Sequence, residues 1–321
     1  MILRNPADRR TMLWAFGLFP AAAAAHYVWP WLSGWLLPLG LYIGFCAGVF
    51  SHNHNHCPTF VSRRANVLYA AWISFFYGYP TFAWIPTHNQ NHHKYINRPG
   101  DATITWRYSK RHTWLVASTY FFVSAYWQSE PLKEFIRKAR QTNPAVFRQI
   151  VGQYSMVAAG HLACFALAVW LHGWGLGTIV YLCALGVPAG FALWSMIFIN
   201  YIQHVHCDPW SKHNHSRNFV SPSANWLVFN NGYHTAHHEQ PGAHWSKLAE
   251  LHGKIAENID PQLRQPSILW FCAKNYVLGH VFPSLRTRQV GRAAYDVPGG
   301  ELVLATASVE ATEAGVNATI A

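Results

Sequence analysis

Histidine is concentrated in four short clusters of this 321-residue sequence. The clusters lie at residues 52–56, 88–93, 200–206 and 234–238, and they contain 11 of the 20 histidines. Neutral imidazole is the commonest metal ligand near pH 7. Histidines four residues apart lie on one face of a helix, where they can bind the same ion. Four such clusters in one chain indicate a centre with more than one metal ion.

The rest of the sequence has the composition of a membrane protein. Hydrophobic residues make up 51% of the chain and charged residues only 12%, whereas a soluble domain has about 25% charged residues. No Lys or Arg occurs between Arg10 and Arg63 or between Arg148 and Lys212. Each interval is long enough for two membrane spans of about 20 residues. The net charge of +11 therefore indicates a cytoplasmic face rather than a nucleic-acid-binding groove.

The sequence predicts an all-α integral membrane fold with four transmembrane helices in two hairpins. Interfacial helices and a cytoplasmic histidine-rich cap complete this predicted fold. The predicted spans are Met12–Pro30, Trp31–Phe50, Ile150–Leu171 and Leu176–Asn200, with the second hairpin joined at His172-Gly-Trp-Gly. Basic residues before the first span predict a cytoplasmic N-terminus. The C-terminus and all four clusters then lie on the same side.

Two further apolar stretches are flanked by basic residues on both sides. Val67–Pro86 is predicted to be a re-entrant or interfacial hairpin broken around Gly78-Tyr-Pro80, and His112–Trp127 to lie along the membrane surface. A helix is expected around Trp245–Ile259. Residues 1–297 are predicted to form a single membrane domain, and residues 298–321 a disordered tail.

The ligand chemistry favours iron. A zinc site closes with four ligands and would leave most of these histidines unused. Soluble di-iron bundles use glutamate ligands. This chain has only 13 acidic residues, and none of them lies within the four clusters. Iron accepts imidazole, and an iron pair can activate dioxygen. These residues therefore predict a dimetal centre held mainly by histidine.

The clusters resemble the histidine boxes of the membrane fatty acid desaturase and hydroxylase superfamily, in particular the acyl-lipid desaturases. The superfamily pattern is HxxxH, then HxxHH or HxxxHH, then HxxHH, and an NxxxH element follows the last span in stearoyl-coenzyme A desaturases. Tyr201-Ile-Gln-His-Val-His is similar to the Tyr-Leu-Gln-His-Thr-His of plant oleate desaturases. Gly232-Tyr-His-Thr-Ala-His-His-Glu-Gln-Pro-Gly is similar to the last box of acyl-lipid desaturases. The resemblance extends from about Trp35 to Ile259.

The resemblance implies two iron ions, with dioxygen as co-substrate. It implies nine histidine ligands: His52, His56, His88, His92, His93, His204, His234, His237 and His238. It also implies that Asn200 holds a metal-bound water. The second box has three residues between His88 and His92, where many desaturases have two. This difference shifts His88 by one position relative to the His92/His93 pair.

The resemblance implies an oxygen-dependent desaturase that introduces a C=C bond into a lipid acyl chain. The chain shows no haem, iron–sulfur or dinucleotide-binding motif. An external ferredoxin or cytochrome, with its reductase, is therefore expected as electron donor, and membrane lipid as a further partner. No nucleic-acid partner is expected. The expected location is the bacterial inner membrane, with both termini and the active site in the cytoplasm.

Several alternatives remain open at the level of sequence. The same site could serve a hydroxylase or ketolase acting on a fatty acyl chain, a carotenoid or another lipid. A more distant alternative is a non-enzymatic metal-binding membrane protein. His54 points to the opposite helical face from His52 and His56, and His206 competes with His204 as a ligand. Asp101 and Asp208 could each orient a ligand imidazole or be solvated or capping residues.

Overall fold

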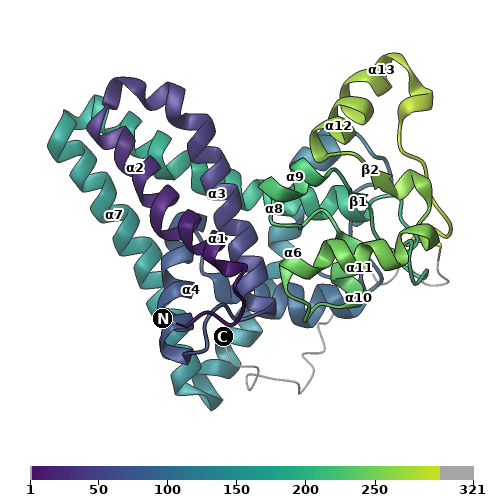
Figure 1. The fold of residues 1–321 in the computed structure, drawn as a ribbon, viewed down its shortest axis with the longest axis horizontal. Helices are drawn as coiled ribbons and strands as arrows, with labels where there is room; N and C mark the ends of the chain where they lie inside the picture. Colours follow the sequence, from purple (N-terminus) through teal and green to yellow (C-terminus); the bar gives the residue numbers. More distant parts are fainter. Residues whose placement is uncertain (1, 297–321) are drawn as a thin grey trace. The chain divides into compact units, whose positions relative to one another are not determined.

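The computed structural model describes residues 2–296, which are mainly helical and divide into two compact units (Figure 1). The first unit comprises residues 2–85 and Phe135–Met196, and the second comprises Pro86–Glu134 and residues 197–296. Two helices, α6 (Trp114–Thr142) and α8 (Val187–His204), run from one unit into the other. The predicted tail at 298–321 lies outside the described residues.

The first unit contains the long apolar helices. Besides parts of α6 and α8, its elements are α1 (Asp8–Met12), η1 (Leu13–Leu18), α2 (Phe19–Val28), η2 (Pro30–Leu32), α3 (Ser33–His56), α4 (Arg63–Tyr77), η3 (Thr81–Ala83), α7 (Pro144–Tyr181) and η5 (Leu182–Gly186). α3 packs against α4 and η5, and α4 packs against α7. A Cβ atom on Gly44 of α3 would lie 2.4 Å from the main-chain oxygen of Pro188. Glycine therefore allows close packing of backbones, as is common between membrane helices.

Three helical stretches are long and apolar enough to cross a membrane. They are Asp8–Val28, Pro30–His56 and Pro144–His204, with 21, 27 and 61 residues. A straight helix of the third length would span about 90 Å, three times the thickness of the hydrocarbon core. The first two agree with the predicted first hairpin, although the second helix extends to His56 and includes the first histidine box.

The 61-residue stretch reverses at Gly173. This residue has φ 74° and ψ 170°, so the helix is interrupted there, within the predicted joint His172-Gly-Trp-Gly. The two arms pack closely at Gly177. A Cβ at this position would lie 2.4 Å from the oxygen of Ala168, so only glycine fits there. His161 and the Tyr181 hydroxyl, 20 residues apart, also approach within 3.0 Å. The stretch thus has the two arms of a hairpin, while the arrangement of four spans in a bilayer stays a prediction.

The chain turns between α4 and the second histidine box, where the sequence predicts a break. α4 ends at Gly78, whose φ is 76°. The buried side chain of Gln153 on α7 then holds the turn, since its Oε1 accepts hydrogen bonds from the Phe82 amide and the Thr81 hydroxyl at 3.0 and 3.3 Å. This anchor fixes the start of the segment that carries His88.

The second unit is built from short elements. They are η4 (Ile85–His92, which begins in the first unit), α5 (His93–Tyr95), β1 (Asn218–Phe219), α9 (Pro222–Leu227), α10 (His234–Glu239), η6 (Trp245–Lys247), α11 (Leu248–Ile255), η7 (Ala256–Asn258), η8 (Pro261–Leu263), β2 (Arg264–Gln265), α12 (Ile268–Cys272), η9 (Ala273–Leu278), α13 (Gly279–Val281) and η10 (Pro283–Leu285). β1 and β2 pair in parallel, and α10 packs against α11 (Figure 1). The helix predicted around Trp245–Ile259 is confirmed as η6, α11 and η7.

A buried arginine ties these short elements together. Arg217 is fully buried, and its guanidinium donates to the main-chain oxygens of Ile202 and Val205 and to the Thr287 hydroxyl. It also lies 4.6 Å from the ring centroid of Phe271. One side chain therefore connects the end of α8 with the C-terminal helices.

Candidate metal centre

The second histidine box lies on a wide helical turn. Residues 85–92 form a π-type helix, in which hydrogen bonds join residues five apart, and α5 follows directly. The ring of His88 stacks on that of His92 at 5.2 Å, and its Nε2 lies 3.1 Å from Nε2 of His93. All three imidazoles of this box therefore lie close together.

The last histidine box forms α10. Thr235 holds the start of this short helix, because its amide donates to the Asn218 side chain on β1 at 2.9 Å and its hydroxyl pairs with that of Ser216. His234 and His238 are one turn apart, and their Nε2 atoms are separated by 3.0 Å. The small two-stranded sheet thus helps to position α10.

Four buried imidazoles from three segments of the second unit converge on one point. One nitrogen from each of His92, His204, His234 and His238 lies within 4.8 Å of the corresponding nitrogens of the others. The closest pairs, at 3.0–3.1 Å, are His92 with His204, His204 with His234 and His234 with His238. Neighbouring ligands that are each about 2.1 Å from one metal ion are separated by about 3 Å. The group therefore fits one metal ion.

Hydrogen bonds at the Nδ1 atoms of His92 and His204 determine which ring nitrogen of each is free to bind a metal ion. Nδ1 of His92 lies 2.8 Å from a carboxylate oxygen of Asp101, and Nδ1 of His204 lies 3.1 Å from the His215 carbonyl. Both oxygens only accept hydrogen bonds, so both Nδ1 atoms carry the proton. In the neutral rings, both Nε2 atoms then present lone pairs to each other at 3.1 Å. A cation between them removes this repulsion.

Hydrogen bonds to both carboxylate oxygens hold Asp101 in place beside the His92 imidazole. Its carboxylate is fully buried and accepts hydrogen bonds from the Asn97 amide at 2.6 Å and from the Thr103 amide and hydroxyl at 2.7 Å. Burial alone would raise the pKa of Asp101, but His92 and the hydrogen bonds lower that pKa to about 2. Asp101 therefore takes the orienting role, whereas Asp208 accepts from the Trp210 amide in a turn.

Sequence reasoning missed the other members of this network. Asn97 donates to the His204 carbonyl and has φ 60°, a backbone conformation that asparagine adopts more readily than most residues. Asp101 itself was a usable signal, since an Asp side chain often accepts a hydrogen bond from the backbone amide two residues on, here that of Thr103.

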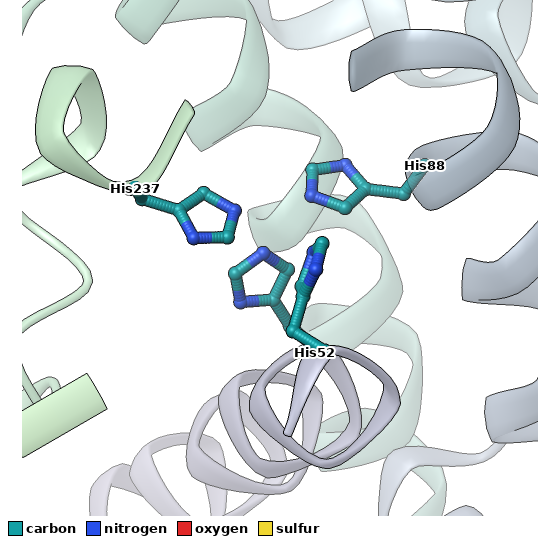
Figure 2. A group of neighbouring side chains, drawn as sticks. His52, His88 and His237 are labelled. Carbon is teal, nitrogen blue, oxygen red and sulfur yellow. The ribbon is translucent and has the colours of Figure 1, made fainter. Parts of the chain in front are cut away.

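The remaining box histidines of this unit form a second group. Nε2 of His93 lies 3.1 Å from that of His88 and 3.0 Å from that of His237. Figure 2 shows the rings of His88 and His237 opposite each other, and their centroids are 5.9 Å apart with nearly parallel planes. The three imidazoles therefore lie close together.

The first box belongs to the first unit, at the end of α3. His52, labelled in Figure 2, and His56 are one turn apart with ring centroids separated by 4.8 Å, so both lie on one face. His54 points elsewhere, as expected from its position: its Nδ1 lies 2.9 Å from the Thr59 hydroxyl, and its ring packs against Tyr69. The structure thus gives His54 a packing role.

Asn200 and His206 differ in their surroundings. The side-chain nitrogen of Asn200 is buried without a hydrogen-bonding partner among the described residues, one turn before His204 on α8. Such a group fits a bound water. His206 has φ 60°, and its ring packs against His112 at 5.2 Å rather than joining the four-histidine group.

The surroundings of His238 and His215 favour the neutral forms of their imidazoles. Burial, followed by the neighbouring histidines, lowers the pKa of His238 well below its usual value. Burial also lowers the pKa of His215, whose carbonyl holds His204, to about 4. Neutral imidazole is the form that binds metal, so His238 can bind an ion at neutral pH.

Comparison with known proteins identifies the family. The family model named fatty acid desaturase matches residues 26–267, which include all four clusters. The chain belongs to this family. It is therefore an oxidoreductase, and its apolar helices are those of a membrane protein. No solved structure matches the chain.

Two curated relatives carry the same name. The chain is 26% identical to the sphingolipid delta(4)-desaturase/C4-monooxygenase DES2 of Homo sapiens over 286 residues, covering 84% of this chain and 79% of the relative. The protein of that name from Rattus norvegicus is 26% identical over 225 residues, covering 66% and 62%. The resemblance deduced from the histidine boxes is confirmed, and the chain belongs among lipid desaturases and hydroxylases.

Proposed function

We propose that this protein is an oxygen-dependent desaturase that introduces a C=C bond into a lipid acyl chain at a di-iron centre. The observation that carries the proposal is the group of four buried imidazoles, with no carboxylate among its ligand atoms. Membership of the fatty acid desaturase family supports this reaction type. The irons, with dioxygen, would supply the oxidant that removes two hydrogens from adjacent carbons.

Nine histidines are proposed as ligands in two sets. His92, His204, His234 and His238 would hold one iron. His88, His93 and His237 would contribute to the other, together with His52 and His56 of the first box, which share one face of α3. Asn200 would hold a metal-bound water through its buried amide nitrogen.

The chain's own residues orient the ligands and exclude water. Asp101 and the His215 carbonyl fix two imidazoles in the tautomer that presents Nε2 to the metal. The four imidazoles of the first set are at most 7% exposed, so bulk water has little access to the site. A dry site of this kind limits side reactions of a strong oxidant.

The electron balance requires an external donor. Removing two hydrogens from the acyl chain releases two electrons, and reducing dioxygen to two waters consumes four. We propose that a ferredoxin or cytochrome, with its reductase, delivers the other two. We also propose that the four helical arms cross a bacterial inner membrane, with both termini and the site on the cytoplasmic side.

Gas chromatography–mass spectrometry of total lipids tests the proposal in cells that express the wild type or His237→Ala. A new double bond in acyl chains, present with the wild type and absent with the variant, is the expected result. His213→Gln is the matched control, because His213 pairs with Glu239 at 2.7 Å and lies outside both ligand sets. Unchanged lipids from cells that contain an iron-loaded wild type would reject ordinary membrane acyl chains as substrate.

Hydroxylation is the second candidate, because both relatives are named as desaturase and C4-monooxygenase. The same experiment separates the two reactions, since a hydroxylated product gains one oxygen and keeps its hydrogens on the neighbouring carbon. Adding sphingoid and carotenoid lipids to the culture extends the test to those substrates. An oxygenated product alone would assign the protein as a hydroxylase or ketolase.

A further inference from the structure

A continuous helical run near the end of the described chain presents apolar side chains to the exterior. The run consists of α12, η9 and α13 and is followed by Phe282 (Figure 1). We call its exposed apolar side chains the apolar face: Leu269, Trp270, Val277, Leu278, Val281 and Phe282, which are 37–83% exposed. The opposite side of the run is anchored, because Phe271 and Tyr276 are buried. The run is therefore fixed to the second unit, while its outward side is mainly apolar, with His280 also exposed.

The start of α6 enlarges this surface. Trp114 packs against Tyr276 with ring centroids 5.4 Å apart and remains 48% exposed, and the next residue, Leu115, is 65% exposed. Exposed apolar side chains on two adjoining elements are unusual on a protein surface in contact with water. Such patches mark contacts with a membrane or with another protein.

Positive charge borders the apolar face. A pocket of about 250 Å³ is lined by Lys274, Arg286 and Arg288, together with Asn275, Ser284 and Thr287 among others, and none of its lining residues is acidic. Arg286 is held in place by a 2.7 Å hydrogen bond from its Nε to the Gly279 carbonyl. Between Asp260 and Asp296 the sequence has five Lys or Arg residues and no acidic residue. The pocket therefore suits a phosphate group.

We propose that residues 268–288 form a membrane-interface anchor. The apolar face would enter the headgroup and acyl boundary of the bilayer, and the basic pocket would hold the phosphate of an anionic phospholipid. A segment that combines exposed Leu, Trp, Val and Phe with clustered Lys and Arg has the composition of such anchors. An acidic protein would match the charge but would leave six large apolar side chains without an apolar counterpart. The segment begins after residue 267, where the match to the family model ends.

Tryptophan quenching tests insertion of the apolar face in the full chain, reconstituted in lipid nanodiscs. The nanodiscs contain phosphatidylcholine and phosphatidylglycerol, with bromine on acyl carbons near the headgroup. The difference in quenching between the wild type and Trp270→Phe isolates the signal of Trp270 from those of the other 15 tryptophans. We expect Trp270 to be quenched by brominated lipid and protected from acrylamide in the water. Quenching by acrylamide alone would overturn the proposal.

Bromine on only one of the two lipids tests the basic pocket. We expect phosphatidylglycerol to be enriched severalfold around Trp270 in the wild type. In Lys274→Gln/Arg288→Gln the enrichment should disappear, since each basic residue near an anionic surface contributes about fivefold in binding. Lys247→Gln/Lys254→Gln is the matched control, because both lysines are exposed on or beside α11 and pair with Glu250.

Two results would contradict the pocket assignment. Equal enrichment in the two double variants would mean that the pocket does not select the lipid. A raised KM for the electron donor in Lys274→Gln/Arg288→Gln, with no change in lipid enrichment, would assign the surface to an acidic protein instead. The lipid-enrichment readout is independent of the substrate and reaction type proposed above.

Discussion

Replacing Asp101 by Asn should weaken the metal site and the second unit together. The two carboxylate oxygens share four hydrogen bonds: Oδ2 accepts from His92 and the Asn97 amide, and Oδ1 accepts from the Thr103 amide and hydroxyl. An asparagine has one acceptor oxygen, and its NH₂ group would face donors at the other position. Asp101→Asn therefore loses two of the four hydrogen bonds.

The size of the effect follows from those bonds. A hydrogen bond to a charged group contributes about 1.5–3 kcal/mol, so losing two should lower the free energy of unfolding by about 3–6 kcal/mol. Losing the partner of a ligand imidazole typically lowers metal affinity by about 10–100-fold. Because the pKa of Asp101 is lowered to about 2, the carboxylate is ionised at pH 7 and both losses apply there.

Iron retention against a graded series of chelator concentrations measures the first effect, and thermal unfolding followed by tryptophan fluorescence measures the second. Asp208→Asn is the matched control, since Asp208 accepts from a main-chain amide in a turn. Iron retention and unfolding temperature that match the wild type in Asp101→Asn would refute the proposed role of this carboxylate. Equal losses in both variants would show a general effect of removing an acidic residue from the second unit.

Three further predictions concern the metal and the packing. Removing iron with a chelator should lower the unfolding temperature, and adding Fe²⁺ should restore it, because the ion binds the folded state; no change on removal would contradict the metal assignment. Gly177→Ala should destabilise the protein more than Gly173→Ala. The first places a Cβ 2.4 Å from the Ala168 oxygen, whereas the second adds backbone strain at φ 74° and ψ 170° in open space, about 1–3 kcal/mol. The yield of folded protein in size-exclusion chromatography compares the two. Arg217→Met should cost at least about 2 kcal/mol, because two main-chain oxygens lose a buried donor; an unchanged unfolding temperature would contradict this.

The sequence is most informative where a local period defines the geometry. His234 and His238 are four residues apart, so any helix through them brings their imidazoles to one side, and the structure has them 3.0 Å apart. The break at Gly173 was also predictable, because two glycines follow His172 within three residues and favour a reversal between apolar arms. These features depend on neighbouring residues alone.

Distances between distant residues could not be predicted from spacing. The spacing between His92 and His204 gives no reason to expect their nitrogens 3.1 Å apart, because that contact requires the fold of the whole second unit. The apolar face at 268–282 was missed for another reason. Its buried and exposed positions both carry apolar residues, so the sequence shows no alternation of polar and apolar sides.

The second box shows how the fold can absorb a change in spacing. In an α-helix of 3.6 residues per turn, His88 and His93 would point roughly 140° apart, and one imidazole would be directed away from the other. The π-type turn over residues 85–92 closes hydrogen bonds between residues five apart. This wider turn brings the two Nε2 atoms to 3.1 Å while His92 stays stacked on His88. The wider turn therefore compensates for the extra residue between His88 and His92, and the three imidazoles of this box lie close together.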